Sequence, residues 1–211
     1  MSNEVKTKEK VDMDPKYIIK LTVTLFITCV IVAAALGGVN AITKEKIEAI
    51  NWEKTQVSMK AVVADKDNTL FSEEALENTD EMIAAASSAG ATLDSVYEAL
   101  VNDERVGYAI KVVASGSQGN IEMMVGVDTE GVVTGVDIVA NSETSGIGSK
   151  VMSNEPTAAG VGVLTQFEGK SAADGALTVG SNVDAISGAT VSSKGVTTGV
   201  NAALAVAGVV G

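Results

Sequence analysis

The stretch that decides the fold is Ile121-Glu-Met-Met-Val-Gly-Val-Asp-Thr-Glu-Gly-Val-Val-Thr-Gly-Val-Asp-Ile-Val139. Two runs rich in β-branched residues, 121–127 and 132–139, flank the polar segment Asp128-Thr-Glu-Gly131. Apolar runs of this length on either side of a short Asp- and Gly-containing segment are typical of two antiparallel strands joined by a tight turn. The sequence therefore predicts a β-hairpin over residues 121–139.

The segments on either side of this hairpin extend the pattern. Upstream, Tyr108, Ile110 and Val112 alternate with their neighbours, and residues 102–105 and 116–119 read as turns, which predicts an antiparallel meander over 94–140. Downstream, apolar spacing from 191 to 206 predicts a helix with Gly208 as its stop signal, and 158–167 is predicted as a short helix. We expect an α+β fold, an antiparallel sheet packed by helices.

The N-terminal part has a different character. Between Lys20 and Lys44 lie 23 residues without a charge. As a helix they rise about 34 Å, enough to cross a hydrocarbon core of about 30 Å. A buried core helix and a signal peptide are the alternatives, but Gly37-Gly-Val-Asn40 makes a poor cleavage site. The sequence favours a retained transmembrane helix.

These features predict the organisation of the chain. Residues 1–16 form a polar cytoplasmic tail, 17–43 the transmembrane helix, 44–92 a helical stalk with an acidic segment, and 93–211 the α+β domain. One or two short helices are expected within 65–92. The lysines divide almost evenly about the apolar run, and most acidic residues follow it, which favours a cytoplasmic N-terminus and an extracytoplasmic domain.

Composition excludes several classes of function. A net charge of −12 without a visible basic face argues against nucleic acid as a partner. The chain has no His and a single Cys, so His-ligated metals, Ser–His–Asp catalysis and a Cys-ligated cluster are excluded within this chain, and no metal site is predicted. Any redox chemistry must come from an added cofactor or a partner subunit.

The segment with the clearest chemical potential is Asp184-Ala-Ile-Ser-Gly-Ala-Thr-Val-Ser-Ser193, a Gly-containing turn that leads into the predicted C-terminal helix. Thr190 falls at the helix start, where it could simply be a cap. The same position suits a phosphate, because a helix N-terminus offers unpaired N–H donors and a partial positive charge. The hydroxyls of Ser192 and Ser193 would add donors.

These residues also resemble a known family. Residues 184–190 are similar to the Asp-x-x-Ser/Thr-Gly-Ala-Thr signature of covalent FMN-binding domains, and 143–148 are similar to its Glu-Thr-Pro-Gly-Leu-Gly element. Ser145 replaces the Pro of that element, so the loop is less rigid. Two members fit, the G subunit of the Rnf complex and the C subunit of the sodium-pumping NADH:quinone reductase, and the short chain favours the former.

The resemblance implies a covalent cofactor. It implies FMN attached through a phosphoester to Thr190 and installed from FAD by a separate magnesium-dependent flavin transferase. Besides Ser192 and Ser193, the residues predicted to take part in FMN binding follow the two motifs: Asp184, Ser187, Gly188, Ala189, Glu143, Thr144 and Gly146. Residues 93–211 would then be the FMN-binding domain.

The resemblance further implies a function. The chain would be an electron carrier in the cell membrane, a subunit of a complex that couples ferredoxin:NAD⁺ electron transfer to Na⁺ or H⁺ translocation, with the other subunits as partners. Two alternatives stay open. The chain could be a stand-alone extracytoplasmic flavoprotein that delivers electrons to an extracellular acceptor, or an anchored binding module in which Thr190 is only a helix cap.

Overall fold

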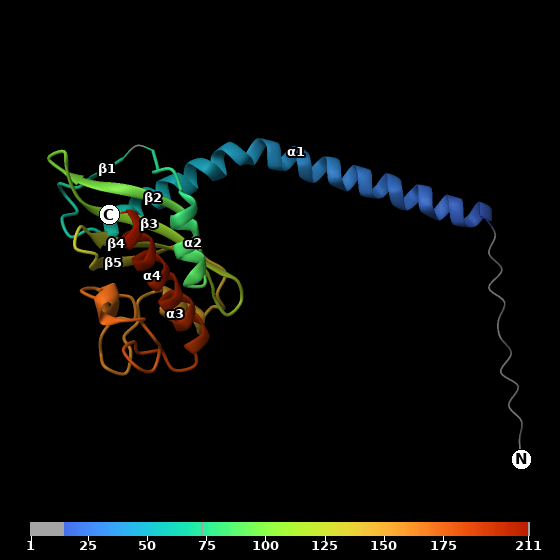
Figure 1. The fold of residues 1–211 in the computed structure, drawn as a ribbon. Coiled ribbons are helices and arrows are strands. Elements are labelled where there is room, and N and C mark those ends of the chain that lie inside the picture. Colours follow the sequence, from blue (N-terminus) through green and yellow to red (C-terminus); the bar gives the residue numbers. More distant parts are fainter. Residues whose placement is uncertain (1–14, 73, 211) are drawn as a thin grey trace, which may run out of the picture. The chain divides into compact units, whose positions relative to one another are not determined.

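A computed structural model describes residues 15–72 and 74–210. The chain divides between Asn51 and Trp52 into two compact units. Secondary structure follows the chain as one long helix, a short strand and helix, four long strands, and a C-terminal part of loops, short helices and a final long helix (Figure 1).

The first unit consists of helix α1, Pro15–Ala61, up to Asn51. Within the described residues α1 is the one helix that is long and apolar enough to cross a membrane. Its threonine hydroxyls donate to carbonyls four residues back, as Thr22 does to Ile18 at 2.9 Å and Thr24 does to Lys20 at 2.8 Å. Such bonds satisfy polar side chains without any partner outside the helix, as a hydrocarbon environment requires.

The second unit is built on a five-stranded sheet. Its strands are β1 (Leu70–Phe71), β2 (Ala91–Val101), β3 (Glu104–Ser115), β4 (Asn120–Asp128) and β5 (Val133–Asn141), and each pairs antiparallel with the next in chain order. The α+β class and the antiparallel meander predicted from the sequence are therefore confirmed.

Two helices cover one face of the sheet (Figure 1). They are α2, Asp80–Ser88, and α4, Thr190–Val210. The α4 side chains Val196 and Val200 are fully buried in one core cluster with Ile110 and Met123 of the sheet. Burial of apolar side chains on both elements fixes α4 along the sheet, and so fixes where its N-terminus lies.

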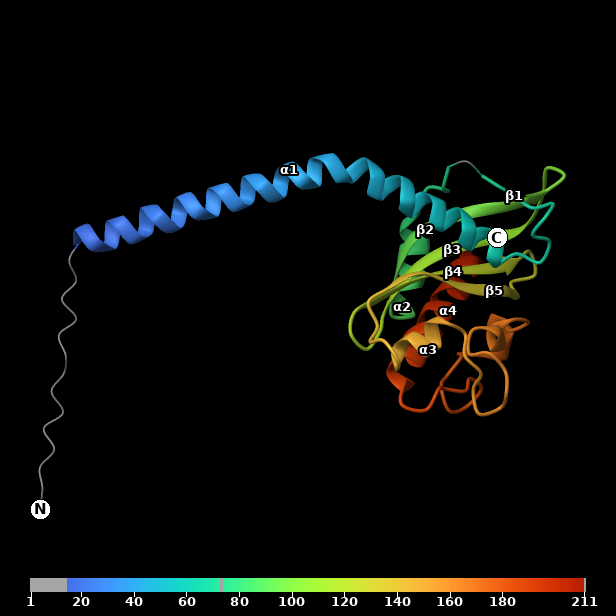
Figure 2. The same cartoon turned by 180° about the vertical axis from the view of Figure 1, so that it is seen from behind.

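The last turns of α1 belong to the second unit and cover the other face (Figure 2). Met59 and the following Val62 form a core cluster with Tyr97, Ala109 and Met124. Gly126 and Gly135 are opposite each other in β4 and β5, and a Cβ on Gly126 would lie only 2.2 Å from the Val62 carbonyl oxygen. The two glycines thus make room for the chain where it leaves α1.

Three local expectations are wrong. The segment 65–92 contains the expected short helix, α2, but its residues Leu70–Phe71 pair with β2 as an edge strand. Residues 158–167 are mostly turns, and only Thr165–Phe167 forms a short 3₁₀ helix. Gly208 lies inside α4, which continues to Val210, because nothing in its surroundings requires the helix to stop there.

Candidate functional site

The meander places its turns at two ends of the sheet, and the predicted site lies at one of them. The β3–β4 turn, the segment after β5 and the N-terminus of α4 enclose a cavity of about 290 Å³. Helix α3, Gly148–Met152, begins beside it. The lining residues come from these four segments: Ser117, Gln118, Glu143, Thr144, Ile147, Gly148, Gly188, Ala189, Thr190, Val191 and Ser192.

The turn before α4 is held from both sides. Gly188 has φ +83°, which a glycine adopts at little cost, and the Ala189 N–H donates to the Ile186 carbonyl at 2.9 Å. At Asp184, earlier in the same segment, the Gln166 side chain accepts from the backbone N–H at 2.8 Å and donates to the backbone carbonyl at 2.9 Å. These contacts fix the path by which the chain enters α4.

Thr190 is the first residue of α4, as the sequence predicts, and its side chain is exposed at the cavity. Within residues 15–72 and 74–210 its hydroxyl has no hydrogen-bond partner. The first helical i→i−4 bond is that of the Ser193 N–H to the Ala189 carbonyl, at 2.9 Å. The N–H groups of the preceding turn are left for other acceptors, as at any helix start.

The two serines of this turn have other partners. Ser192 and Ser193 are each 1% exposed. The Ser192 hydroxyl donates to Glu143 Oε2 at 2.6 Å, and the Ser193 hydroxyl donates to the Ala189 carbonyl at 3.1 Å. Both hydroxyls are therefore engaged within the protein and do not donate into the cavity.

Glu143 is the carboxylate of the cavity. Its Oε1 accepts from the Ser117 N–H at 2.6 Å and from the Gln118 N–H at 3.4 Å, while Oε2 accepts from Ser192. It is half-buried, and no Lys or Arg is among the residues that line the cavity. An anion there would rely on the helix start for its stabilisation.

The structure brings together only part of the predicted set. Glu143, Thr144, Gly188, Ala189, Thr190 and Ser192 line the cavity, whereas Asp184, Ser187, Ser193 and Gly146 lie in the adjoining turns outside its lining. Sequence reasoning missed Ser117, Gln118 and Gln166. The turn at 116–119 was expected, but nothing in the sequence indicates that it meets Glu143, 26 residues further on.

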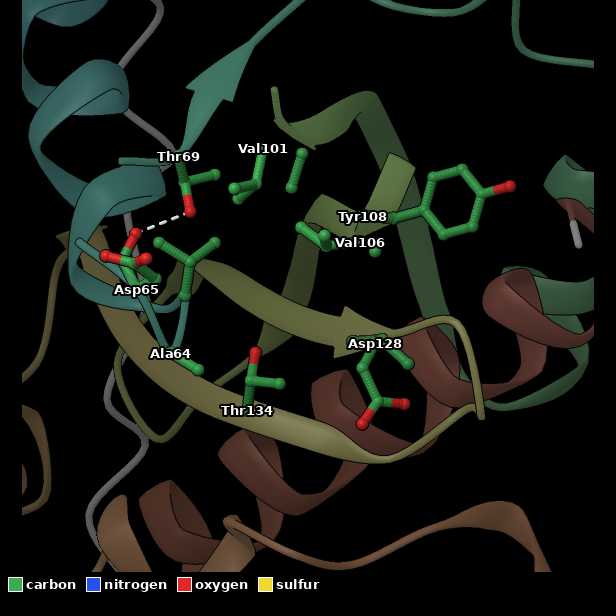
Figure 3. Close-up of a pocket in the computed structure, with 12 residues that line it drawn as sticks. Ala64, Asp65, Thr69, Val101, Val106, Tyr108, Asp128 and Thr134 are labelled. Carbon is green, nitrogen blue, oxygen red and sulfur yellow. Dashed lines mark hydrogen bonds between the residues drawn. The ribbon is translucent and has the colours of Figure 1, made fainter. Parts of the chain in front are cut away.

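A second cavity lies at the opposite end of the sheet, where the β2–β3 and β4–β5 turns meet (Figure 3). It has a volume of about 380 Å³, and apolar side chains such as Val101 and Val106 form much of its wall. Asp65 and Asp128 lie at its sides, and a hydrogen bond of 2.5 Å joins the Thr69 hydroxyl to the Asp65 carbonyl (Figure 3). It contains none of the motif residues.

The lining of the first cavity fits the phosphate of a flavin mononucleotide. An unpartnered hydroxyl, that of Thr190, stands at the start of a 21-residue helix, beside backbone N–H groups and an open polar cavity. A phosphodiester, as FMN would be once linked to a hydroxyl, carries less negative charge than the phosphomonoester of free FMN, whose charge at neutral pH is about −1.5 to −2. That difference suits a cavity that has one carboxylate and no basic side chain in its lining.

Comparison with known proteins defines the class. Residues 116–205 match the family model described as the FMN-binding domain, and this range contains the whole lining of the first cavity. The chain is also 34% identical to the G subunit of the Na⁺-translocating ferredoxin:NAD⁺ oxidoreductase complex of Acetobacterium woodii, over 96% of this chain and 97% of that protein. The chain belongs to the family of G subunits of ion-translocating oxidoreductase complexes.

Other relatives are more distant. The G subunit of the proton-translocating ferredoxin:NAD⁺ oxidoreductase complex of Clostridium ljungdahlii is 28% identical, over 92% of this chain and 93% of that protein. The crystal structure of the C subunit of Na⁺-translocating NADH-quinone reductase from Parabacteroides distasonis has a TM-score of 0.45 at 21% identity, covering 78% of this chain and 93% of that one.

Proposed function

We propose that this chain is an electron-relay subunit of a membrane complex that couples electron transfer between ferredoxin and NAD⁺ to ion translocation. The observation that carries the proposal is the polar cavity at the start of α4, within the range that matches the FMN-binding domain. When bound, FMN supplies the redox chemistry. The other redox steps would fall to partner subunits, since the relatives of this chain are subunits of multisubunit complexes.

The proposed attachment point is Thr190. Its hydroxyl is exposed at the cavity, and a phosphoester there would place the phosphate against the free N–H groups of the first helical turn. Gly188, Ala189 and the backbone of Asp184 shape the turn that presents Thr190. Ser187 is exposed beside them, where a maturation enzyme has access to it.

Attachment requires a second protein, a flavin transferase that uses FAD. The Thr190 Oγ–H bond breaks and an Oγ–P bond forms to the phosphorus on the FMN side of FAD. The P–O bond to AMP breaks at the same time. AMP leaves with the electron pair of that bond, and the hydroxyl proton is released. No oxidant or reductant is needed, because the flavin is transferred unchanged.

Flavin fluorescence after denaturing electrophoresis tests the proposal. The full chain is produced together with a flavin transferase, and the wild type should keep a fluorescent band because the link is covalent. Thr190→Val replaces the hydroxyl with a methyl group at an exposed position, so the band should disappear while the protein remains folded. Ser181→Ala, at an exposed position outside the cavity, is the matched control and should stay fluorescent. A fluorescent Thr190→Val band would contradict the assignment.

We further propose that α1 crosses the cell membrane once, with the N-terminus in the cytoplasm and the flavin domain outside it. The support is the length and apolar composition of α1 and the excess of acidic residues after it. A single engineered Cys at Ser181, in a Cys29→Ser background, should react with a membrane-impermeant thiol reagent added to intact cells. Reaction only after the cells are opened would reverse the orientation.

A further inference from the structure

Glu143 connects three segments that are far apart in the sequence. It follows β5, its Oε1 accepts from the Ser117 N–H at 2.6 Å in the β3–β4 turn, and its Oε2 accepts from the Ser192 hydroxyl at 2.6 Å in the first turn of α4. Hydrogen bonds to an ionised acceptor are about twice as strong as bonds between neutral groups. Because Ser192 is 1% exposed, its bond to Glu143 is shielded from competing water.

Two glycines make the space that this carboxylate occupies. A Cβ on Gly116 would lie 2.0 Å from Glu143 Oε1, and a Cβ on Gly148 would lie 2.2 Å from Oε2. Any other residue at either position would push the carboxylate away. The cavity wall is thus shaped around the Glu143 carboxylate at both of its oxygens.

The hydrogen bonds of this carboxylate to the protein leave it little capacity to contact a bound flavin. Both oxygens already accept hydrogen bonds from the protein, and the Ser192 hydroxyl donates to Glu143 instead of into the cavity. Thr190 is two residues before Ser192 in the same helical turn, so whatever holds Ser192 also holds the backbone that carries the Thr190 side chain.

We propose that Glu143 is a positioning residue for flavin attachment: its carboxylate ties the β3–β4 turn to the first turn of α4 and so holds the Thr190 hydroxyl in the geometry that accepts the phosphate. This inference rests on the proposed attachment of FMN to Thr190. The carboxylate acts through Ser192 and the turn, not by contact with the flavin.

The first experiment measures the rate at which a flavin transferase and FAD label the purified full chain in detergent. Glu143→Gln keeps the size of the side chain, but its amide can accept at only one of the two positions. Its kcat for labelling should fall about tenfold with little change in KM, because Thr190 is still present but less well oriented. Ser192→Ala should lower the rate in the same direction, and the double variant should lose less than the product of the two effects.

Matched controls separate positioning from general stability. Glu168→Gln changes an exposed glutamate outside the cavity and should label at the wild-type rate. Ile110→Val removes one methylene from a fully buried core residue, so it lowers the melting temperature without touching the cavity. It should also label normally. A Glu143→Gln protein that labels like the wild type, or an Ile110→Val protein that labels as slowly as Glu143→Gln, would overturn the proposal.

The hydrogen bonds by which Glu143 joins the β3–β4 turn to the first turn of α4 are called the clamp here. Amide hydrogen exchange tests this clamp in the absence of flavin. It is measured in the Thr190→Val background, where no attachment occurs. Adding Glu143→Ala, which removes both acceptor oxygens, should speed exchange at the Ser117 and Gln118 amides at least tenfold, with exchange in the centre of β3 unchanged. Unchanged protection at these amides would overturn the clamp even if FMN is attached at Thr190. A wild-type chain that is never labelled, with the exchange effect present, would overturn the proposed function and leave the clamp intact.

Discussion

At the residue scale, the pKa of Lys111 in the sheet depends on two acidic neighbours. Its Nζ lies 3.0 Å from Asp94 Oδ2 and 3.5 Å from Glu122 Oε2, and its side chain is 15% exposed. Burial alone would lower the pKa of Lys111, but the hydrogen bond and charge of Asp94, with those of Glu122, outweigh burial and raise the pKa above its usual 10.5. The ion pairs thus stabilise the charged form in the folded protein.

This upward shift fixes the sign of a pH effect. Because the folded pKa is above the unfolded value, the stability contributed by Lys111 is fully present below pH 10.5 and is lost as pH rises through the folded pKa. The difference in unfolding free energy between the wild type and Lys111→Met should therefore be constant near neutral pH and shrink above 10.5. Urea unfolding across that range measures it, with the exposed Lys66→Met as control. If the difference in unfolding free energy grew with pH, the upward shift of the Lys111 pKa would be contradicted.

At the residue scale, the sequence was most informative where chemistry is local. The start of α4 at Thr190 could be predicted, because a Gly-containing turn, a cap and helical spacing all fall within about ten residues. The bond between Glu143 and Ser192 could not, since it depends on how the sheet and α4 pack. The motif singles out Glu143, but it does not show which groups donate hydrogen bonds to its carboxylate.

At the scale of elements, two glycines of α4 differ in how much space surrounds them. A Cβ on Gly195 would lie 2.6 Å from the Ser115 carbonyl oxygen, whereas Gly208 has nothing within 4 Å. Gly195→Ala should lower the unfolding free energy by about 1–3 kcal/mol, because a helix cannot move from a backbone atom without losing core contacts. Gly208→Ala should raise it by about 0.5–1 kcal/mol through helix propensity. Chemical denaturation compares them, and equal effects of the two variants would contradict the packing.

The elements differ in how far the sequence predicts them. The hairpin around Asp128 was predictable from alternation and turn chemistry, since Gly131 has φ +80° and the Asp128 carboxylate accepts from the N–H groups of Glu130 and Val132, both at 2.9 Å. Residues 158–167 were not, because Ala158, Ala159 and the apolar residues after them favour a helix, whereas Gly160 and Gly162 disfavour it and the chain forms turns. Strand β1 has two residues, too few for any periodicity.

At the scale of the whole molecule, the last turns of α1 are part of the flavin domain. Met59 and Val62 are 2% and 0% exposed and pack on Tyr97, Ala109 and Met124. A fragment of residues 52–211 should therefore fold without detergent, and a fragment of 63–211 should be less stable by about 3 kcal/mol or more, because two apolar contacts are lost. Circular dichroism in urea compares them, since the single Trp is absent from the shorter fragment. Equal midpoints would show that α1 adds nothing to the domain.

The sheet and α4 together place Thr190 at the cavity, within reach of a bound flavin phosphate. Tandem mass spectrometry of the peptide that contains Thr190, from full chain produced with a flavin transferase, tests the attachment of FMN most directly. We predict a mass increase of FMN minus one water, with fragment ions that place it on Thr190 and not on Ser187, Ser192 or Ser193. An unmodified peptide, or the same increase on a neighbouring serine, would contradict attachment at Thr190.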